Sequence, residues 1–417
     1  MKSNYKRLGD YIKPVREKNI DLKASKLLGI NIDKFFMPSV ANVVGTDMSN
    51  YKIVKKGQFA CNRMHVGRDY RIPIALSKEE NPFMVSPAYD VFEINNTKML
   101  LPEYLMMWFT RKEFDRNCWF HTDADVRGGL PWNAFCDLEL PIPSPEKQQE
   151  IVQEYHTIQN RIALNNQLIS KLEETAQAIY KQWFVEFEFP FVTSSGVEMP
   201  YRSNGGKMVW CAELEKEIPE GWEVGTISHL NLDISDGNYS GKYPKPHEFV
   251  ESGIPFVRGV DFNNKSINPR NLIFISEKKH KELKKGHLKK NDILITTRGA
   301  SIGKYAYVTD KFIDKNINSQ LIRINGNENY SNFFLGCMIN TESFKNLFET
   351  YSTGSAQPQL PIKNFLQIDV VIPKKDVLIS FEKYRLLLDK YLFKSNQNQK
   401  LEELKDLLLA KMTRVEN

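Results

Sequence analysis

The sequence predicts an α+β (mixed α/β) fold in which two similar strand-rich halves are joined by two long helices that pair as a coiled coil. Three observations predict this fold: a series of motifs that occurs twice, a long heptad stretch in each copy, and short apolar runs rich in β-branched and aromatic residues. The chain has 417 residues, which is long enough for two or three folding units that each bury a core.

The repeat is recognised by three motifs that recur in the same order about 230 residues apart. They are a dibasic turn leading into an apolar run, at 55–61 and 289–295; Leu-Pro-x-x-x-Phe followed by Ile-Pro, at 130–143 and 360–373; and Lys-Leu-Glu-Glu, at 171–174 and 400–403. One such match could arise by chance. Three in order at nearly the same offset indicate a tandem duplication.

Each copy ends in a long stretch without proline or glycine. In the first, apolar residues step alternately by four and three positions, which is the spacing of a coiled-coil seam. The second, from about 376 to 412, is interrupted by the polar run 395–399, and Asn165 and Asn166 occupy the matching middle of the first. The predicted seam comprises Ile158, Ile162, Asn165, Ile169, Leu172, Leu388, Leu401 and Leu408, and Leu404 is among the apolar residues of the second stretch that are expected to follow it.

Two interpretations of these stretches are open. They could be amphipathic core helices of separate domains, or they could pair with each other, with their polar centres face to face. One helix at the same place in each copy favours pairing.

Between the helices, both halves read as strand-rich mixed domains. Residues 5–129 and 222–359 contain short runs of Val, Ile, Phe and Tyr broken by Gly, Asn, Asp and Pro, with helical patches among them. Residues 188–221 hold several Ser, Gly and Asn clusters and are predicted to be the linker between the copies.

Several protein classes are excluded by composition and motifs. No apolar run is long enough to cross a membrane, and the first residues lack the apolar core of a secretory signal, so we expect a cytoplasmic protein. Five widely spaced cysteines and seven histidines form no C-x-x-C or H-x-x-x-H pattern, so we expect reduced, buried thiols and no metal. The segment 299–304 resembles a phosphate-binding loop but lacks the Ser or Thr that should follow Lys304. We therefore expect no enzyme activity and no cofactor.

The positive charge is concentrated in one segment. The formal net charge is +6, and residues 276–304 alone hold nine Lys and Arg against three Asp and Glu. A solvated surface is one interpretation of this segment, and a strip that faces a polyanion such as DNA is the other.

A duplication without a catalytic motif suggests two similar modules that read one duplex. The side chains that recognise the DNA sequence should lie on loops, where Arg, Lys, Asn, Ser and Tyr can hold phosphates or contact base edges. A plain surface role is an equally good interpretation of any single residue in this set. The candidates are Asn62, Arg63, Arg68, Arg71 and Arg127 in the first half, and Tyr239, Lys242, Arg258, Lys289, Lys290, Arg298, Ser301 and Lys304 in the second.

The chain resembles the specificity (S) subunit of type I restriction-modification systems (HsdS family) over essentially its full length. The resemblance rests on Pro-Glu-Gly-Trp-Glu at 219–223, the run from Lys289 through Arg298 to Lys304, Gln-Pro-Gln-Leu at 357–360, and Ile-Pro before each long helix. The first half lacks two motifs of the second half: the Gly-Trp pair at 221–222 and the Gly-x-x-x-Gly-Lys signature at 299–304. This difference suggests that the two halves read unlike half-sites.

The resemblance implies two target recognition domains, at 1–144 and 222–374, and two antiparallel spacer helices, at 145–187 and 375–417. It also implies a non-catalytic subunit that binds a bipartite asymmetric site in double-stranded DNA. Its partners would be methyltransferase (M) subunits, two in number, and through them restriction/translocase (R) subunits, with no membrane. S-adenosylmethionine and ATP would be bound by those partners.

Two other functions are compatible with the same sequence. The first is a coiled-coil scaffold with two protein-binding modules and no DNA role, and the second is a solitary DNA-modifying enzyme with a degenerate site. Binding to a duplex that weakens steeply with salt would distinguish the DNA-binding subunit from the scaffold.

Overall fold

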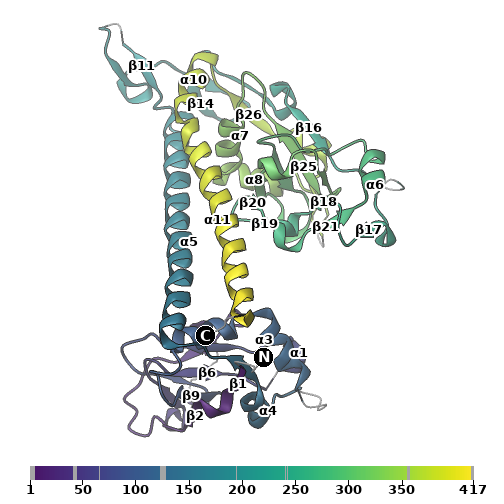
Figure 1. Ribbon diagram of the computed structural model, residues 1–417. Coiled ribbons are helices and arrows are strands. Elements are labelled where there is room, and N and C mark those ends of the chain that lie inside the picture. The colour runs from purple at the N-terminus through teal and green to yellow at the C-terminus, as the bar shows by residue number, and fades with distance from the viewer. Residues whose placement is uncertain are drawn as a thin grey trace. The chain divides into compact units, whose positions relative to one another are not determined.

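A computed structural model describes the chain at residues 5–40, 45–64, 66–122, 128–193, 195–239, 241, 243–354 and 357–414. The chain divides into two compact units (Figure 1). Unit 1 consists of Met1–Ile162 and Leu401–Asn417, and unit 2 of Ala163–Lys400. Each long helical stretch therefore contributes one segment to each unit.

Unit 1 is built on a four-stranded antiparallel sheet backed by short helices. The strand order is β2 (Ile12–Val15), β9 (Asp90–Ile94), β6 (Phe59–Cys61) and β7 (Ile74–Leu76). The helices are α2 (Pro102–Phe109), α3 (Lys112–Phe120) and α4 (Trp132–Asp137). Smaller pairs are β3 (Leu28–Ile30) with β4 (Phe36–Pro38), and β5 (Lys52–Val54) with β8 (Phe83–Val85).

Unit 2 repeats this arrangement. Its sheet order is β16 (Asp233–Asp236), β25 (Leu321–Asn325), β22 (Ile293–Thr296) and β23 (Tyr305–Tyr307), and its helices are α7 (Asn332–Ile339), α8 (Glu342–Thr350) and α9 (Ile362–Phe365). A second sheet joins β17 (Phe249–Val250), β21 (Ile273–Ile275), β18 (Ile254–Val257) and β24 (Asn316–Ile317), and β19 (Phe262–Asn263) pairs with β20 (Ser266–Ile267). The same chain order of sheet strands and helices in both units supports the tandem duplication that the motifs predict.

The Leu-Pro-x-x-x-Phe motif recurs because it closes each unit in the same way. Leu130 and Phe135, like Leu360 and Phe365, are almost fully buried, and the proline between them precedes the first turn of α4 or α9. Proline suits that position because it needs no N–H partner there. The following strands, β10 (Glu139–Pro141) and β26 (Asp369–Ile372), then return to pair with the first strands, β1 (Tyr5–Arg7) and β15 (Glu223–Thr226).

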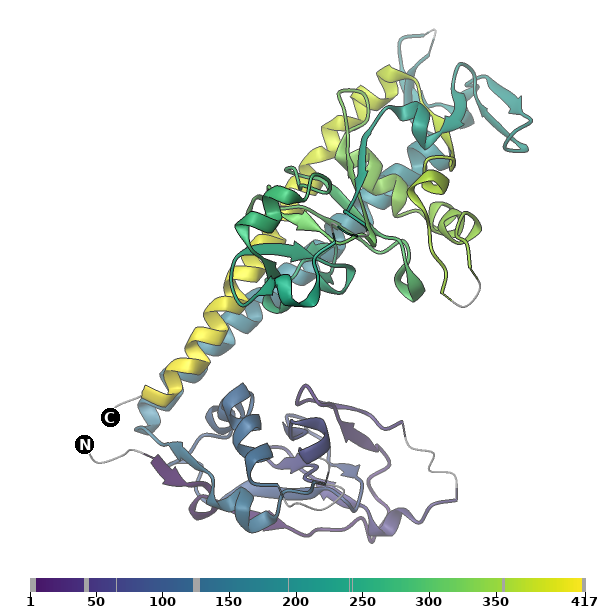
Figure 2. The same ribbon diagram turned by 90° about the vertical axis from the view of Figure 1, so that its right-hand side faces the viewer.

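The first long stretch forms one helix, and the second is interrupted near its start. Helix α5 (Pro145–Tyr180) continues into a π-helical turn (Lys181–Val185). The second stretch consists of α10 (Lys375–Phe381), a 3₁₀ turn (Glu382–Arg385) and α11 (Leu386–Lys411). Within unit 2, α5 and α11 lie side by side (Figures 1 and 2).

The pairing of the two helices is antiparallel and polar at its centre. In unit 2, Asn165 Nδ2 donates to Gln397 Oε1 at 3.0 Å and to Asn398 Oδ1 at 2.8 Å, while Leu172 and Leu388 pack in one cluster further along. The residue number rises on α5 as it falls on α11, so the chains run in opposite directions. The polar centres of the two stretches therefore face each other, which is the arrangement that pairing predicts.

The remaining seam residues lie in the hydrophobic cores, with one exception. Ile158, Ile162, Leu401 and Leu408 pack in the core of unit 1, and Ile169 packs in that of unit 2. The placement of Leu404 in the seam is wrong, because its side chain is 48% exposed. Instead the seam of α11, with its alternating steps of four and three residues, passes through Leu401, Lys405, Leu408 and Met412. Lys405 is half-buried and pairs with Glu402.

The segment 188–221 forms two β-hairpins. They join β11 (Pro190–Val192) to β12 (Glu198–Pro200), and β13 (Met208–Cys211) to β14 (Lys216–Pro219). Phe189 stacks on Trp222 with ring centroids 5.2 Å apart, and Phe187 meets the same indole edge-on at 5.5 Å. These aromatic contacts order a segment whose Ser, Gly and Asn clusters, taken alone, predict only a linker.

Other expectations can be compared with the described residues. All five cysteines are free, and four are buried, while Cys136 is only half-buried. Among the described helices, none joins sufficient length to sufficient apolarity for a membrane span.

The polar centre of the helix pair yields the first prediction. Asn165 is 1% exposed, and Asn165→Ala removes the donor to Asn398 Oδ1 and one of the two donors to Gln397 Oε1, which keeps Lys394, in a largely buried seam. We expect the free energy of unfolding to fall by about 1–3 kcal/mol in chemical denaturation followed by circular dichroism. The matched control is Asn160→Ala, an exposed asparagine on the same helix, which should be neutral or slightly stabilising. Equal losses in the two variants would contradict the role of this seam.

Candidate nucleic-acid interface

In unit 2 the loop after the central strand β22 is held against the segment that precedes α9. The Gly299 N–H donates to the Pro358 carbonyl at 2.9 Å, and the Leu360 N–H donates to the Thr297 carbonyl at 2.9 Å. Gly299 has φ 70°, and apart from its chain neighbours no heavy atom of the described residues lies within 4 Å of the position that a Cβ would occupy. The loop is therefore fixed at its base and open at its tip, where backbone can approach a ligand closely.

The second glycine of this loop has a different role. Gly303 has φ 82°, and a Cβ there would lie 2.6 Å from the ring of Phe348. The Gly-x-x-x-Gly-Lys signature is thus explained by packing at its second glycine rather than by phosphate binding.

Arg298 projects from this loop with its charge uncompensated. Its side chain is exposed and Nη2 donates to Gln359 Oε1 at 3.0 Å, and among the described residues no carboxylate pairs with it. The neighbouring Tyr239 is half exposed, and burial, assisted by Asp236, raises the pKa of its phenol to about 12. At neutral pH the guanidinium of Arg298 is positively charged and the phenol of Tyr239 is neutral. Both groups can donate hydrogen bonds to base edges and phosphates.

Unit 1 presents its corresponding loop at the same place. This loop follows the central strand β6 and contains α1 (Val66–Asp69). The Leu130 N–H donates to the Arg63 carbonyl at 2.9 Å, and the Gly67 N–H donates to the Gly128 carbonyl at 2.7 Å. A Cβ on Gly67 would lie 2.7 Å from Gly128 Cα, so this close contact requires glycine. The two units therefore fix equivalent loops by equivalent backbone hydrogen bonds.

The predicted residues of the first half divide into structural and exposed groups. Arg63 donates through Nε to Asp90 at 2.7 Å, donates to the Leu130 carbonyl, and lies over the Trp132 ring, so its charge is used within the fold. Asn62 Oδ1 accepts from the Met64 N–H at 3.1 Å and shapes the turn. Arg127 lies outside the described residues.

Arg68 and Arg71 are the accessible cations of this loop. Arg68 pairs with its neighbour Asp69 at 2.7 Å, and Arg71 pairs with Asp33 at 3.0 Å. Arg71 also lies 3.7 Å from the buried Asp115. The pairs with Asp69 and Asp33 are more exposed and are worth at most about 1 kcal/mol, so a phosphate can replace those carboxylates at little cost.

In the second half, Arg258 is structural and two other candidates are accessible. Arg258 contacts Asp261 through Nε at 3.2 Å and Nη2 at 2.9 Å, and the Asp261 side chain is only 1% exposed. Withdrawing this arginine would leave a buried charge unpaired. Lys304 is exposed, and Ser301 Oγ contacts the Arg298 carbonyl at 3.4 Å. Lys242 lies outside the described residues.

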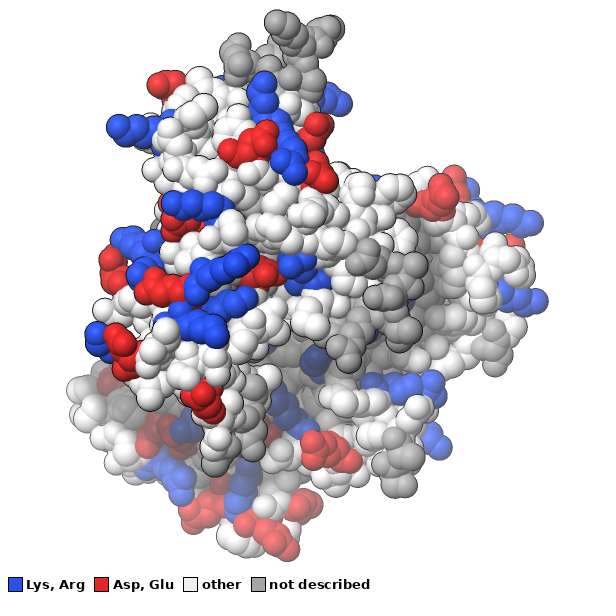
Figure 3. All heavy atoms as spheres, turned by 90° about the horizontal axis from the view of Figure 1, so that it is seen from below, with Lys and Arg blue, Asp and Glu red and all other residues white. Residues whose placement is uncertain are grey.

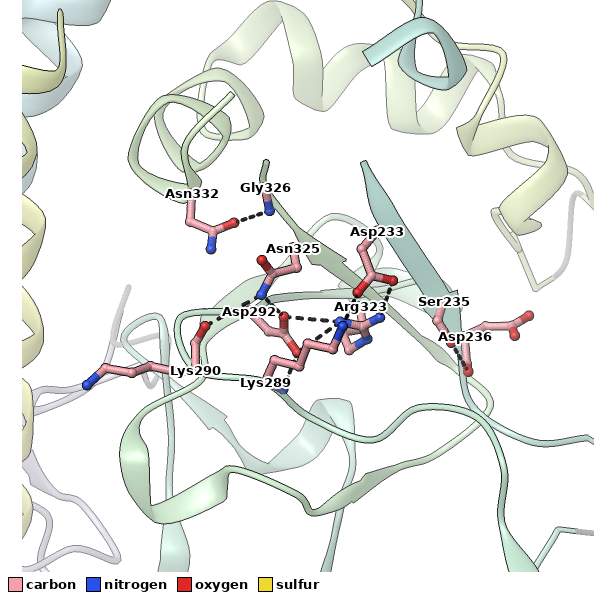
Figure 4. Close-up of polar contacts among 10 residues, drawn as sticks. All are labelled: Asp233, Ser235, Asp236, Lys289, Lys290, Asp292, Arg323, Asn325, Gly326 and Asn332. Atoms are coloured by element: carbon pink, nitrogen blue, oxygen red, sulfur yellow. Dashed lines mark hydrogen bonds and ion pairs between the residues drawn. The ribbon is translucent and has the colours of Figure 1, made fainter. Parts of the chain in front are cut away.

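The dibasic turn before β22 is tied to a buried ion network (Figure 4). Lys289 Nζ lies 2.7 Å from Asp233, which also accepts from Arg323 Nη2 at 2.6 Å, and Arg323 Nη1 lies 3.2 Å from the fully buried Asp292. Burial alone would raise the pKa of Asp233, but the hydrogen bonds from Lys289 and Arg323 outweigh it and lower that pKa. Lys290 pairs with Asp310 at 3.1 Å. Both lysines are exposed and their ion pairs are exchangeable.

The segment 276–304 is not a surface of one sign. Lys279 pairs with Glu248 at 3.0 Å, Lys281 with Glu277 at 2.8 Å, and Lys285 with Asp236 at 3.4 Å. Seen from below, the molecule as a whole also presents Lys and Arg interspersed with Asp and Glu (Figure 3). Binding of a polyanion here would therefore depend on local arrangement more than on bulk charge.

Sequence reasoning missed an exposed aromatic group beside the loop of unit 1. Tyr70, Trp119 and Phe120 are all exposed, and the ring centroids of Tyr70 and Trp119 lie 5.3 Å apart. Tyr70 lies next to Arg71 in the chain, and an aromatic residue beside a cation is a recognisable nucleic-acid signal. The sequence around Trp119 contains no such signal, because only the packing of α3 near α1 brings Trp119 beside Tyr70.

Comparison with known proteins places the second half in a defined family. Residues 219–385 match the type I restriction modification DNA specificity domain. A Haemophilus influenzae protein, the type I restriction enzyme HindI specificity subunit, is 24% identical over 91% of each chain. The type I restriction enzyme MjaIX specificity subunit of Methanocaldococcus jannaschii is 26% identical over 75% of this chain and 68% of its own.

The fold is also similar to a solved structure. The S subunit of a type I restriction-modification system from M. genitalium superposes with a TM-score of 0.54 at 14% identity, over 98% of this chain and 95% of that one. At this identity the likeness concerns the fold. It agrees with two mixed α/β units and two long helices.

Arg298 yields a prediction for binding. Arg298→Ala should weaken binding to duplexes that the wild-type chain selects from a randomised pool by about 5- to 150-fold, because a bidentate contact to a base is worth about 1–3 kcal/mol. The control is Lys278→Ala, another exposed cation of the same unit, which should change affinity much less at the same salt concentration. Fluorescence anisotropy measures both. Equal losses would show that only total charge matters.

The ion network yields a prediction for stability. Arg323→Met leaves the buried Asp292 without its arginine and should lower the free energy of unfolding by about 3–5 kcal/mol. Lys289→Met removes an exposed partner of Asp233 and should cost about 1 kcal/mol or less. Urea denaturation of both variants measures the difference. Similar losses would mean that burial does not distinguish the two ion pairs.

Proposed function

We propose that the chain is the DNA sequence-recognition subunit of a restriction-modification complex, because residues 219–385 match the type I restriction modification DNA specificity domain and the similar proteins are type I restriction specificity subunits. It binds a bipartite asymmetric site in double-stranded DNA, one half-site through each unit, and directs adenine methylation and restriction by its partner subunits. The subunit itself is non-catalytic and acts in the cytoplasm, where its DNA substrate lies.

One observation carries this proposal beyond the family assignment. The loop after the central strand occupies the same topological place in both units and is fixed by the same backbone hydrogen bonds, from Leu130 to Arg63 and from Leu360 to Thr297. Two equivalent loops on duplicated scaffolds suit two half-sites on one duplex, because a duplex offers the same groove to each.

The side chains on the two loops support unlike half-sites. Unit 1 offers Arg68 and Arg71 beside exposed aromatic rings, whereas unit 2 offers Arg298 with a tyrosine hydroxyl and an open glycine. Different donor sets at equivalent places read different base sequences, so the whole site is asymmetric.

The paired helices support a protein partner. In unit 2, α5 and α11 expose the large apolar side chains of Leu164, Leu168, Leu386 and Phe393. Apolar side chains exposed along a helix pair suit a partner subunit. We assign this surface to methyltransferase subunits, two per complex, through which restriction/translocase subunits join. The methyl donor and ATP are then bound by those partners.

The proposal is tested with the chain co-expressed with its methyltransferase subunit. The complex should methylate one bipartite sequence, and the logarithm of its binding constant for that duplex should fall linearly with the logarithm of salt concentration, with a slope of about −0.9 per phosphate contacted. Methylation is measured by sequencing modified bases, and affinity by anisotropy. The chain alone should show no methylation or cleavage.

Two outcomes would contradict the proposal. Failure to bind any duplex, even with the methyltransferase, or binding that is insensitive to salt would favour a scaffold of two protein-binding modules. Methylation or cleavage by the purified chain alone would contradict a non-catalytic subunit.

A further inference from the structure

A cluster of two imidazoles and one carboxylate lies in unit 2, away from the loop that carries Arg298. His280 is on α6 (Glu277–Glu282), His287 follows that helix, and Asp314 precedes β24. His287 Nδ1 lies 3.0 Å from Asp314 Oδ1, and His280 Nε2 lies 3.6 Å from Asp314 Oδ2. One ligand atom from each of the three residues fits within 4.8 Å of the others.

The outer nitrogen of each ring is already hydrogen-bonded. His287 Nε2 donates to the Leu283 carbonyl at 2.6 Å, and His280 Nδ1 donates to Asn316 Oδ1 at 2.6 Å. His287 Nδ1 is also within hydrogen-bonding distance of Asp314 Oδ1, to which it can donate only when the ring is an imidazolium. In the neutral imidazoles the outer acceptors hold the proton, and the lone pair of the inner nitrogen faces Asp314, where a metal ion would take the place of that proton. Metal-ligating histidines show this arrangement, in which an outer hydrogen bond fixes both the tautomer and the ring.

We propose that His280, His287 and Asp314 bind one divalent transition-metal ion of the zinc class. With metal–nitrogen and metal–oxygen bonds of about 2.0–2.2 Å, neighbouring ligands of a tetrahedral ion lie about 3.3 Å apart. The distances of the two imidazole nitrogens from the carboxylate lie on either side of this value, although they run to different oxygens, and all three ligand atoms lie within 4.8 Å of one another, so side-chain rotation must bring them closer around the ion. Two imidazoles favour zinc, cobalt or nickel over magnesium and calcium, which prefer oxygen ligands. The fourth position is left to water.

The burial of the cluster suits such an ion. The His280 side chain is 11% exposed and that of His287 is 35% exposed, while Asp314 is 67% exposed and leaves a path from solvent. The spacing of the histidines predicts no metal site, because the carboxylate is distant in the sequence. The pairing of residues 287 and 316 brings it to them.

The ion would brace the segment that leads to the DNA-reading loop. Leu288 N–H donates to the Lys315 carbonyl at 3.0 Å, and the Asp314 N–H donates to the Leu288 carbonyl at 2.8 Å, so the two ligand-bearing segments are already in register. Lys289 and Lys290 follow directly, and β22 begins at Ile293. A bound ion links α6, this turn and the approach to β24 into one rigid element, and stabilises the folded state by mass action.

The test uses the full chain, without a histidine tag, after removal of metals with a chelator. Titration calorimetry with Zn²⁺ should show one site in the wild type, and Co²⁺ should give the visible absorption bands of a four-coordinate ion with nitrogen and oxygen ligands. Asp314→Ala, a change at an exposed side chain, should weaken Zn²⁺ binding at least tenfold and abolish the Zn²⁺-dependent rise in melting temperature.

The matched control is His247→Ala, which removes an exposed histidine of the same unit and should leave both measurements unchanged. His287→Ala is the second ligand variant and should lose binding like Asp314→Ala. Wild-type binding no tighter than that of either ligand variant would overturn the proposal, as would a cobalt spectrum of the hydrated octahedral ion. Circular dichroism without metal verifies that each variant is folded.

Discussion

The hydrogen bond between the Leu-Pro-x-x-x-Phe segment and the loop after the central strand is the constraint on which each unit depends. The Leu130 N–H reaches the Arg63 carbonyl, and the Leu360 N–H reaches that of Thr297. The same segment buries its leucine and phenylalanine, starts a short helix and delivers the last strand to the first. One short motif therefore fixes the loop after the central strand, closes the sheet region and sets the point at which the long helix begins.

Local patterns in the sequence predicted the repeat, the helices and most of the seam, because periodicity and motif spacing are properties of neighbouring residues. They failed at Leu404, where the polar run shifts the seam to Lys405. They also could not separate Arg298, which has no carboxylate partner among the described residues, from Arg63. Arg63 contacts Asp90, and that contact depends on sheet pairing between residues distant in the sequence.

The cations of unit 2 differ in how freely they can serve a DNA duplex. Lys289 and Lys290 are held by exposed carboxylates, and such pairs contribute at most about 1 kcal/mol, so phosphates can replace them. Arg258 is held by a carboxylate that is almost fully buried, and releasing it would leave that charge unpaired. The +6 net charge thus overstates the cationic surface that is free to meet a polyanion, and Arg298 contacts an amide oxygen rather than a carboxylate.

Comparison of the two duplicated units indicates that the histidine cluster has a role beyond core packing. In unit 1, Ile53 on β5 occupies the place that His287 has in unit 2; it faces Met84 on β8, and both side chains are buried. In unit 2 the segment before the central strand instead pairs His287 with Asn316. An apolar pair satisfies the packing at this place in the fold, and burying imidazole and amide groups there requires hydrogen-bond partners that the apolar pair does not need. The fold therefore does not require polar side chains at this place. A ligand bound by the converging lone pairs of the histidine cluster would explain why they are present.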